Sequence, residues 1–155
     1  MFNVVLVEPE IPPNTGNVGR LCLATGSTLH LVEPLGFSLE DRQLKRAGLD
    51  YWDEVDVQTW DSFAELQARQ MPDARYFFLT TKTAFPYYEI NFQRGDFLVF
   101  GRETRGLPES LLQPNVARCI TIPMQGTRSL NLATAVAIVL FEAVRQQRIS
   151  KIRVE

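Results

Sequence analysis

Short, continuously apolar runs alternate along this chain with stretches in which apolar residues recur every three or four positions. Strands that are apolar on both sides suit a parallel sheet covered on both faces. The runs predict strands at Phe2–Val7, Leu29–Val32, Val55–Thr59, Tyr76–Thr80, Phe97–Phe100 and Cys119–Ile122. The helical patterns predict helices at Thr15–Thr25, Leu39–Ala47, Ser62–Arg69 and Asn131–Gln147, with a short turn near Glu109–Leu112. The alternation predicts a doubly wound α/β fold in a single domain, residues 1–155.

The last predicted helix carries more apolar surface than one face requires. Asn131 is placed to cap its first turn, and from Leu132 to Phe141 the helix is apolar almost all round. Such a helix is buried on more than one side. In a chain of 155 residues we expect part of that burial to come from a second subunit, so the sequence predicts a homodimer.

Composition narrows the class of protein. With 45% hydrophobic and 22% charged residues we expect a globular chain, and a net charge of −2 makes no case for nucleic acid. Cys22 and Cys119 suit a reducing compartment. His30 is the only histidine, which excludes a zinc site with several imidazoles and argues against a histidine-based triad. Without a signal peptide or the roughly 20 apolar residues of a membrane span, we expect a cytoplasmic protein with no membrane partner.

Several frequent signatures are missing from the sequence: the P-loop, a Gly-x-Gly-x-x-Gly turn after the first strand, and Gly-x-Ser-x-Gly. Instead, Asn14, Asn17 and Arg20 are spaced so that they share one side of the first helix. The plain alternative is an N-cap at Asn14, a surface amide and a surface arginine.

A glycine-flanked loop follows the fifth predicted strand. Gly101 and Gly106 enclose Arg102, Glu103 and Arg105, which are poor material for a core. Glycine lets a backbone bend sharply and approach a ligand, and open α/β sheets bind ligands at the carboxyl ends of their strands. The alternative is a surface loop with a salt bridge.

A third loop, from Ile122 to Ser129, leads into the last helix. Its backbone amides and the Ser129 hydroxyl are suited to a polar ligand group, while Ile122, Met124 and Leu130 offer an apolar wall. Together with the other two segments, this loop points to an RNA-modifying enzyme.

These segments resemble the three motifs of the SpoU branch of the SPOUT methyltransferases: Asn14-x-x-Asn17-x-x-Arg20, Phe100-Gly-x-Glu103-x-x-Gly106-Leu107, and Ile122-Pro-Met followed by Ser129-Leu-Asn131-Leu132. The segments Glu8–Asn17 and Leu44–Tyr51 are similar to the minimal, single-domain members of that branch. The resemblance runs essentially the whole length. It implies 2′-O-methylation of the tRNA wobble ribose, at cytidine or uridine 34, with S-adenosyl-L-methionine as donor, S-adenosyl-L-homocysteine as product and no metal. It also implies a parallel-sheet α/β knot with a trefoil-knotted C-terminal region, a homodimer, and no accessory RNA-binding domain.

The resemblance further implies roles for individual residues. Arg20, supplied by the partner subunit, would engage the 2′-hydroxyl. Because a guanidinium offers only donors, we expect it to hold phosphate or stabilise the developing alkoxide, while the proton leaves to water or to an RNA phosphate. Glu103 would orient Arg20 or its own loop, and Asn14 would support the motif. Ser129 and Asn131 would position substrate or cofactor.

The cofactor is expected in the three strand-end loops, at Leu79, Thr80, Gly101, Ile122, Met124, Ser129 and Leu130. Arg102 stands where proline is expected in many relatives. On the RNA side, Arg42, Lys45 and Arg46 share one side of a predicted helix and would grip the anticodon stem-loop, or form a solvated helix face. Two other functions stay open: methylation of another tRNA or ribosomal RNA position, and a non-catalytic RNA-binding paralogue.

Overall fold

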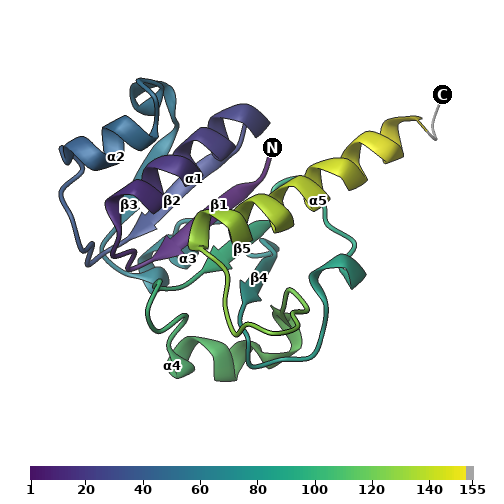
Figure 1. The fold of residues 1–155 in the computed structure, drawn as a ribbon. Helices are drawn as coiled ribbons and strands as arrows, with labels where there is room; N and C mark the ends of the chain where they lie inside the picture. The colour runs from purple at the N-terminus through teal and green to yellow at the C-terminus, as the bar shows by residue number, and fades with distance from the viewer. Residues whose placement is uncertain (153–155) are drawn as a thin grey trace.

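The computed structural model describes residues 1–152 and contains six strands paired in parallel in the order β3-β2-β1-β5-β4-β6 (Figure 1). The strands are β1 (Asn3–Val7), β2 (Thr28–Val32), β3 (Val57–Trp60), β4 (Tyr76–Leu79), β5 (Phe97–Phe100) and β6 (Cys119–Ile120). All six predicted strands are present, and no end is shifted by more than two residues. Residues 153–155 of the predicted domain lie outside the described residues.

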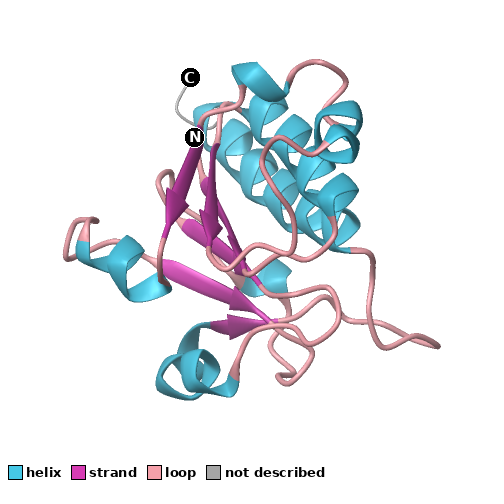
Figure 2. Cartoon of the chain, turned by 90° about the vertical axis from the view of Figure 1, so that its left-hand side faces the viewer, coloured by secondary structure: helices cyan, strands magenta, loops and turns pink. Residues whose placement is uncertain are grey.

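The helices lie on both faces of the sheet (Figure 2). They are α1 (Pro12–Thr25), α2 (Arg42–Ala47), α3 (Phe63–Ala68), α4 (Glu109–Leu112) and α5 (Leu132–Ile152), with 3₁₀ turns η1 (Trp52–Glu54), η2 (Tyr87–Glu89) and η3 (Gln113–Arg118). Val4 and Leu6 pack on the side of α1 and α5, whereas Val5 and Val7 pack with Phe63 of α3. The alternation of β1 between two apolar layers explains its continuously apolar sequence. The doubly wound prediction is confirmed, and the knot stays a prediction.

Two predicted helix starts are wrong. The first helix begins at Pro12 rather than Thr15, because proline fits the first helical position, where no backbone donor is needed. Asn14 therefore lies inside the helix and is not its N-cap. The second helix begins at Arg42 rather than Leu39, because the Asp41 carboxylate accepts the Gln43 N–H at 2.8 Å and ends the preceding turn.

The cap predicted for the last helix is confirmed. Asn131 Oδ1 accepts the Thr134 N–H at 3.3 Å, and its carbonyl accepts the Ala135 N–H at 2.9 Å. The helix is longer than predicted and runs to Ile152. It crosses the same face of the sheet as α1, and the two helices pack against one another (Figure 1).

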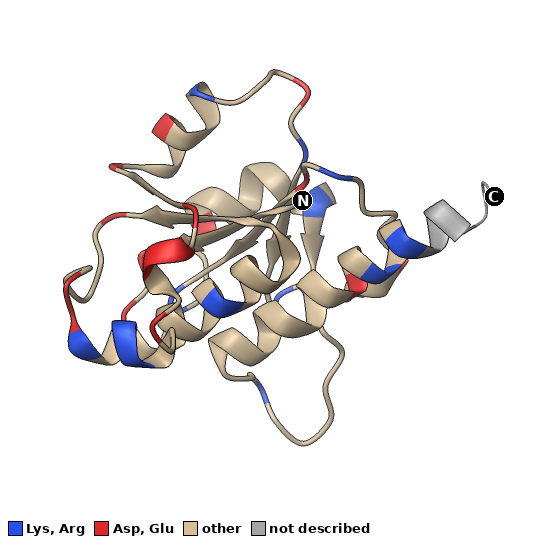
Figure 3. Ribbon diagram, turned by 90° about the horizontal axis from the view of Figure 1, so that it is seen from above, with Lys and Arg blue, Asp and Glu red and all other residues tan. Residues whose placement is uncertain are grey.

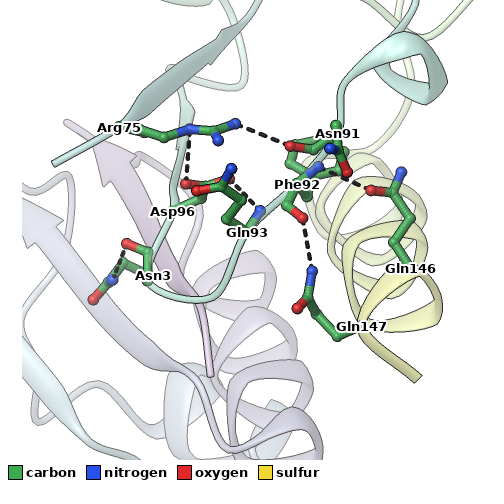
Figure 4. Close-up of polar contacts among 9 residues, drawn as sticks. Asn3, Arg75, Asn91, Phe92, Gln93, Asp96, Gln146 and Gln147 are labelled. Carbon is green, nitrogen blue, oxygen red and sulfur yellow. Dashed lines mark hydrogen bonds and ion pairs between the residues drawn. The ribbon is translucent and has the colours of Figure 1, made fainter. Parts of the chain in front are cut away.

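Polar side chains tie α5 to the amino ends of β4 and β5 (Figure 4). Arg75 Nε lies 3.2 Å from Asp96 Oδ1, a carboxylate with only 3% of its side chain exposed. Gln146 Oε1 accepts the Phe92 N–H at 2.9 Å, and Gln147 Nε2 donates to the Phe92 carbonyl at 2.7 Å. The loop that precedes β5 is thereby fixed on both sides.

The single histidine is a structural residue of the sheet. His30 is 2% exposed, and the Trp60 indole N–H donates to its Nδ1 at 3.0 Å, so Nε2 carries the proton toward Asn3 Oδ1 at 2.9 Å. Burial lowers the pKa of His30 from 6.5 to about 4, which keeps the ring neutral at pH 7.

Candidate functional site

A cavity of about 570 Å³ opens at the carboxyl ends of the strands. The chain order reverses between β1 and β5, and open α/β sheets bind ligands at such switch points. Three loops line the cavity, those that follow β4, β5 and β6. They bring together all seven residues predicted to hold a cofactor: Leu79, Thr80, Gly101, Ile122, Met124, Ser129 and Leu130.

The loop after β5 is a tight turn that depends on two glycines. The Gly106 N–H donates to the Arg102 carbonyl at 2.9 Å, and Gly106 has φ +68°. A side chain at Gly101 would place its Cβ 2.1 Å from the Gly106 carbonyl carbon, so only glycine allows the two segments to meet. The glycines that the sequence singled out therefore shape the cavity wall.

This turn is interlocked with the loop that leads from β1 into α1. Arg102 is ion-paired with Glu8, and its Nε donates to Glu8 Oε2 at 2.8 Å. Glu10 Oε1 accepts the Thr104 hydroxyl at 2.7 Å, and this bond holds the pKa of Glu10 below its usual range. Arg102 thus braces the turn at the position where proline is expected in relatives.

Glu103 completes the interlock from the same turn. Its carboxylate accepts the backbone N–H groups of Glu10 at 2.8 Å and Ile11 at 3.1 Å, just ahead of α1. Glu103 therefore fixes its own turn against the start of α1, and its functional role stays a prediction. Among the described residues it forms no hydrogen bond or ion pair with Arg20.

A chain of hydrogen bonds continues from Glu103 across the three motifs. Asn14 is 8% exposed; its Nδ2 lies 3.5 Å from Glu103 Oε1, and its Oδ1 accepts from Asn131 Nδ2 at 3.0 Å. Asn131 in turn caps α5. Residues 14, 103 and 131 are thus joined directly, which fits the supporting role predicted for Asn14. Ser129 lies exposed on the cavity lining.

Arg20 lies in a second cavity of about 700 Å³ between α1 and α5. Asn17 shares this cavity, whereas Asn14 lines the first, so the polar side of α1 is divided between two sites. Asn131 lines both cavities and joins them. Among the side chains of residues 1–148 and the described backbone, the exposed Arg20 guanidinium has no hydrogen-bond or ion-pair partner.

The sequence reasoning missed most of this second cavity, including Tyr51 and Glu54. These residues reach it because η1 packs on α1: a Cβ at Gly19 would lie 2.8 Å from the Trp52 ring. In the sequence, only Gly19 within the first helix could have indicated this close packing. The sequence reasoning also assigned no role to Glu8 and Glu10, which hold the turn that follows β5.

The three predicted RNA-binding residues lie on α2, which packs closely on α1 at Gly16, where a Cβ would lie 2.2 Å from the Leu44 carbonyl oxygen. Arg42 and Arg46 are exposed. Lys45 forms an ion pair with Glu40 at 2.9 Å. Figure 3 shows basic residues on α2, along α1 and on the loop before α5.

Among the described residues, no group of three or more His, Cys, Asp and Glu side chains is placed to hold a metal ion. In the same part of the chain, no helix combines the length and the hydropathy that crossing a membrane requires.

The model of the SpoU rRNA methylase family matches residues 1–141. The chain belongs to this family. A relative from Burkholderia ambifaria, a tRNA (cytidine(34)-2′-O)-methyltransferase, is 52% identical over 153 residues, and the match covers 94% of this chain and 96% of the relative.

Two solved structures are similar to this chain over nearly its whole length. One that gives structural insights into the 2-OH methylation of C/U34 on tRNA has a TM-score of 0.90 at 48% identity, covering 96% of this chain and 97% of that chain. The SpoU methyltransferase AviRb from Streptomyces viridochromogenes, in complex with the cofactor AdoMet, has a TM-score of 0.82 at 26% identity, covering 96% of this chain and 58% of that one.

Proposed function

We propose that this chain transfers a methyl group from S-adenosyl-L-methionine to the ribose 2′-oxygen of nucleotide 34, cytidine or uridine, of tRNA. Near-full-length identity of about half to tRNA (cytidine(34)-2′-O)-methyltransferases supports this function. The main structural support for this function is the chain of hydrogen bonds from Glu103 through Asn14 to Asn131. This chain connects the cofactor-sized cavity to the cavity of Arg20.

The first cavity fits S-adenosyl-L-methionine. Its volume of about 570 Å³ lies within the range of small-molecule sites. Leu79, Ile122, Met124 and Leu130 give it an apolar wall for a purine ring, and the close approach of the Gly101 and Gly106 backbones shapes the turn that closes one side of it. When bound, this cofactor supplies an activated methyl group, and S-adenosyl-L-homocysteine is released.

The residues of the chain must then align the hydroxyl and assist loss of its proton. Arg20 carries a guanidinium, which has donors only, so it holds a phosphate or stabilises the developing alkoxide. Asn131 stands where the two cavities join and positions the reacting groups, with Ser129 beside it. The proton leaves to water or to an RNA phosphate.

A homodimer completes the site. The cavity of Arg20 has apolar walls from Leu21 and Leu23 of α1 and from Ala133 and Ala137 of α5, and Phe141 of α5 is 45% exposed. Apolar surface of this kind between two helices suits a second copy of the chain, which would take Arg20 to the cofactor cavity of its partner. Sedimentation as a monomer at micromolar concentration would contradict this arrangement.

The RNA contact is proposed at the anticodon stem-loop, in the cytoplasm. Arg42 and Arg46 are exposed cations on α2 and suit phosphate contacts. Lys45 contributes less, because its charge is already paired with Glu40.

The decisive experiment is incubation with labelled S-adenosyl-L-methionine and total tRNA, followed by nuclease mapping of the 2′-O-methylated nucleotide. We expect label at nucleotide 34. Label at another tRNA position, or only on ribosomal RNA in a parallel incubation, would change the assigned substrate but keep the chemistry. Binding of tRNA without transfer would indicate a non-catalytic RNA-binding paralogue.

A further inference from the structure

The cofactor cavity carries more positive charge than its own carboxylates neutralise. Four cationic side chains line it, and two of them are paired: Arg102 with Glu8 and Lys82 with Glu109. The one carboxylate in the lining belongs to Glu103 and is occupied by two backbone N–H groups.

The remaining two cations are Arg105 and Arg128. Both are exposed, and among the side chains of residues 1–148 and the described backbone neither has a hydrogen-bond or ion-pair partner. Arg105 interacts electrostatically with Glu10 without forming an ion pair, and the Glu10 carboxylate already accepts a hydrogen bond from Thr104. The two guanidinium groups therefore remain available to an external anion.

The two arginines belong to different loops of the cavity lining. Arg105 belongs to the interlocked turn after β5, immediately before Gly106. Arg128 belongs to the loop that enters α5, immediately before Ser129. Each arginine is therefore next to a residue that shapes or lines the cavity.

The chemistry of the two substrates decides which anion they receive. S-adenosyl-L-methionine carries a sulfonium and an ammonium against a single carboxylate, so its net charge is positive. RNA carries a phosphodiester on either side of each internal ribose, and the 2′-oxygen is attached next to the carbon that bears the 3′-phosphate. An RNA that presents this oxygen to the cavity brings phosphate to its rim, and guanidinium matches phosphate with two parallel hydrogen bonds.

We infer that Arg105 and Arg128 form a subsite for the phosphodiester groups flanking the methylated ribose. The subsite rests on the proposed function and adds a positioning element to it. It holds the backbone of the target nucleotide so that the 2′-oxygen faces the methyl donor, and it favours an internal nucleotide over a chain end.

The first test compares Arg105→Gln, Arg128→Gln and the double variant with Arg69→Gln. Arg69 is an exposed arginine at the end of α3 that lines neither cavity. We expect each single cavity variant to raise the KM for tRNA about tenfold and to reduce the log–log salt slope of tRNA binding by about one. Calorimetry should give a cofactor Kd within about twofold of wild type. Unchanged tRNA parameters, or a loss confined to cofactor affinity, would overturn the subsite.

The second test removes the charge from the RNA instead. An anticodon stem-loop with one methylphosphonate linkage 3′ of nucleotide 34 should bind wild type about tenfold more weakly than the natural RNA. It should bind the double variant as well as the natural RNA does. An equal loss in both proteins would exclude these arginines as the phosphate contact. Because the measurement is of binding, it stands even if wild type transfers no methyl group, which would refute the proposed function separately.

Discussion

The amino ends of β4 and β5 carry a paired polar cluster, whereas the carboxyl ends carry both the paired side chains of the interlock and exposed cations without a partner. At the amino ends, Arg75, Asp96 and Gln147 are joined to other segments of the chain (Figure 4). At the carboxyl ends and beside them, Arg20 and Arg128 have no hydrogen-bond or ion-pair partner in the described backbone or among the side chains of residues 1–148. Satisfied polar groups stabilise the fold, whereas unpaired cations beside a cavity remain free for a ligand. Changes at the first end should therefore cost stability, and changes at the second should cost activity.

The largest effect is expected at Arg20. Arg20→Ala should lower methyl transfer by about 10³-fold, since it removes a donor aimed at developing negative charge. Cofactor affinity and the free energy of unfolding should stay near wild type, because the side chain is exposed and unpaired. Transfer rates and calorimetry check this, with Arg69→Ala as control. Full activity in the Arg20 variant would remove it from the mechanism.

The buried histidine should make stability depend on pH. The unfolded imidazole has its ordinary pKa of 6.5 and the folded one a pKa of about 4, so the unfolded state binds the proton more tightly. The contribution is complete above pH 6.5 and is lost as the pH falls toward 4, about 3 kcal/mol in all. Denaturant unfolding across this range should show the decline, and His30→Gln should flatten it. An equally steep decline in that variant would contradict the assignment.

Asp96 tests the opposite end of the comparison. Asp96→Ala should lower the free energy of unfolding by about 2 kcal/mol, because it leaves the Arg75 guanidinium and the Gln93 N–H without their carboxylate. Methyl transfer well below the melting temperature should be unchanged. A loss of activity without a loss of stability would break the distinction between the two ends.

Asn131 both caps α5 and donates to Asn14, so substitutions there can separate an effect on stability from an effect on activity. Asn131→Asp keeps an oxygen for the Thr134 N–H but loses the donor to Asn14, so turnover should fall about tenfold with little change in melting temperature. Asn131→Ala should lose the cap as well and become about 1 kcal/mol less stable. Turnover and thermal melts distinguish the two variants. A fully active aspartate variant would show that the bond to Asn14 is dispensable.

The smallest effect is expected on α2. Arg42→Glu with Arg46→Glu should weaken tRNA binding several-fold and flatten its salt dependence, because exposed phosphate contacts contribute additively and weakly. Filter binding at several salt concentrations measures both quantities. Binding identical to wild type would return these residues to a plain solvated face.

The sequence carried information about this fold wherever one segment determines its own structure. The apolar runs predicted β1 to β6 because a strand buried on both faces is continuously apolar within its own sequence. Asn131 was predicted as a cap because the preference of a residue for helix caps is likewise visible in the local sequence. The alternative of an N-cap at Asn14 is wrong because the preference of asparagine for caps competes with proline at position 12, which starts the helix earlier.

Contacts between distant segments were beyond such reasoning. Glu8 and Arg102 are 94 residues apart, and no local pattern pairs them. The motifs did predict that three loops would meet, and the structure brings them to one cavity. The second cavity escaped prediction because it requires the packing of η1 and α5 on α1.

The interlock of the two loops also bears on how the chain matures. Its bonds join Glu10 to Thr104 and Asn14 to Asn131, so the ends of each contact are synthesised about a hundred residues apart. Contacts of such long range close slowly, since a large loop must be ordered first. A nascent chain therefore exposes β1 and the start of α1 well before their anchors emerge, and the two cavities can form only after Asn131 has been synthesised.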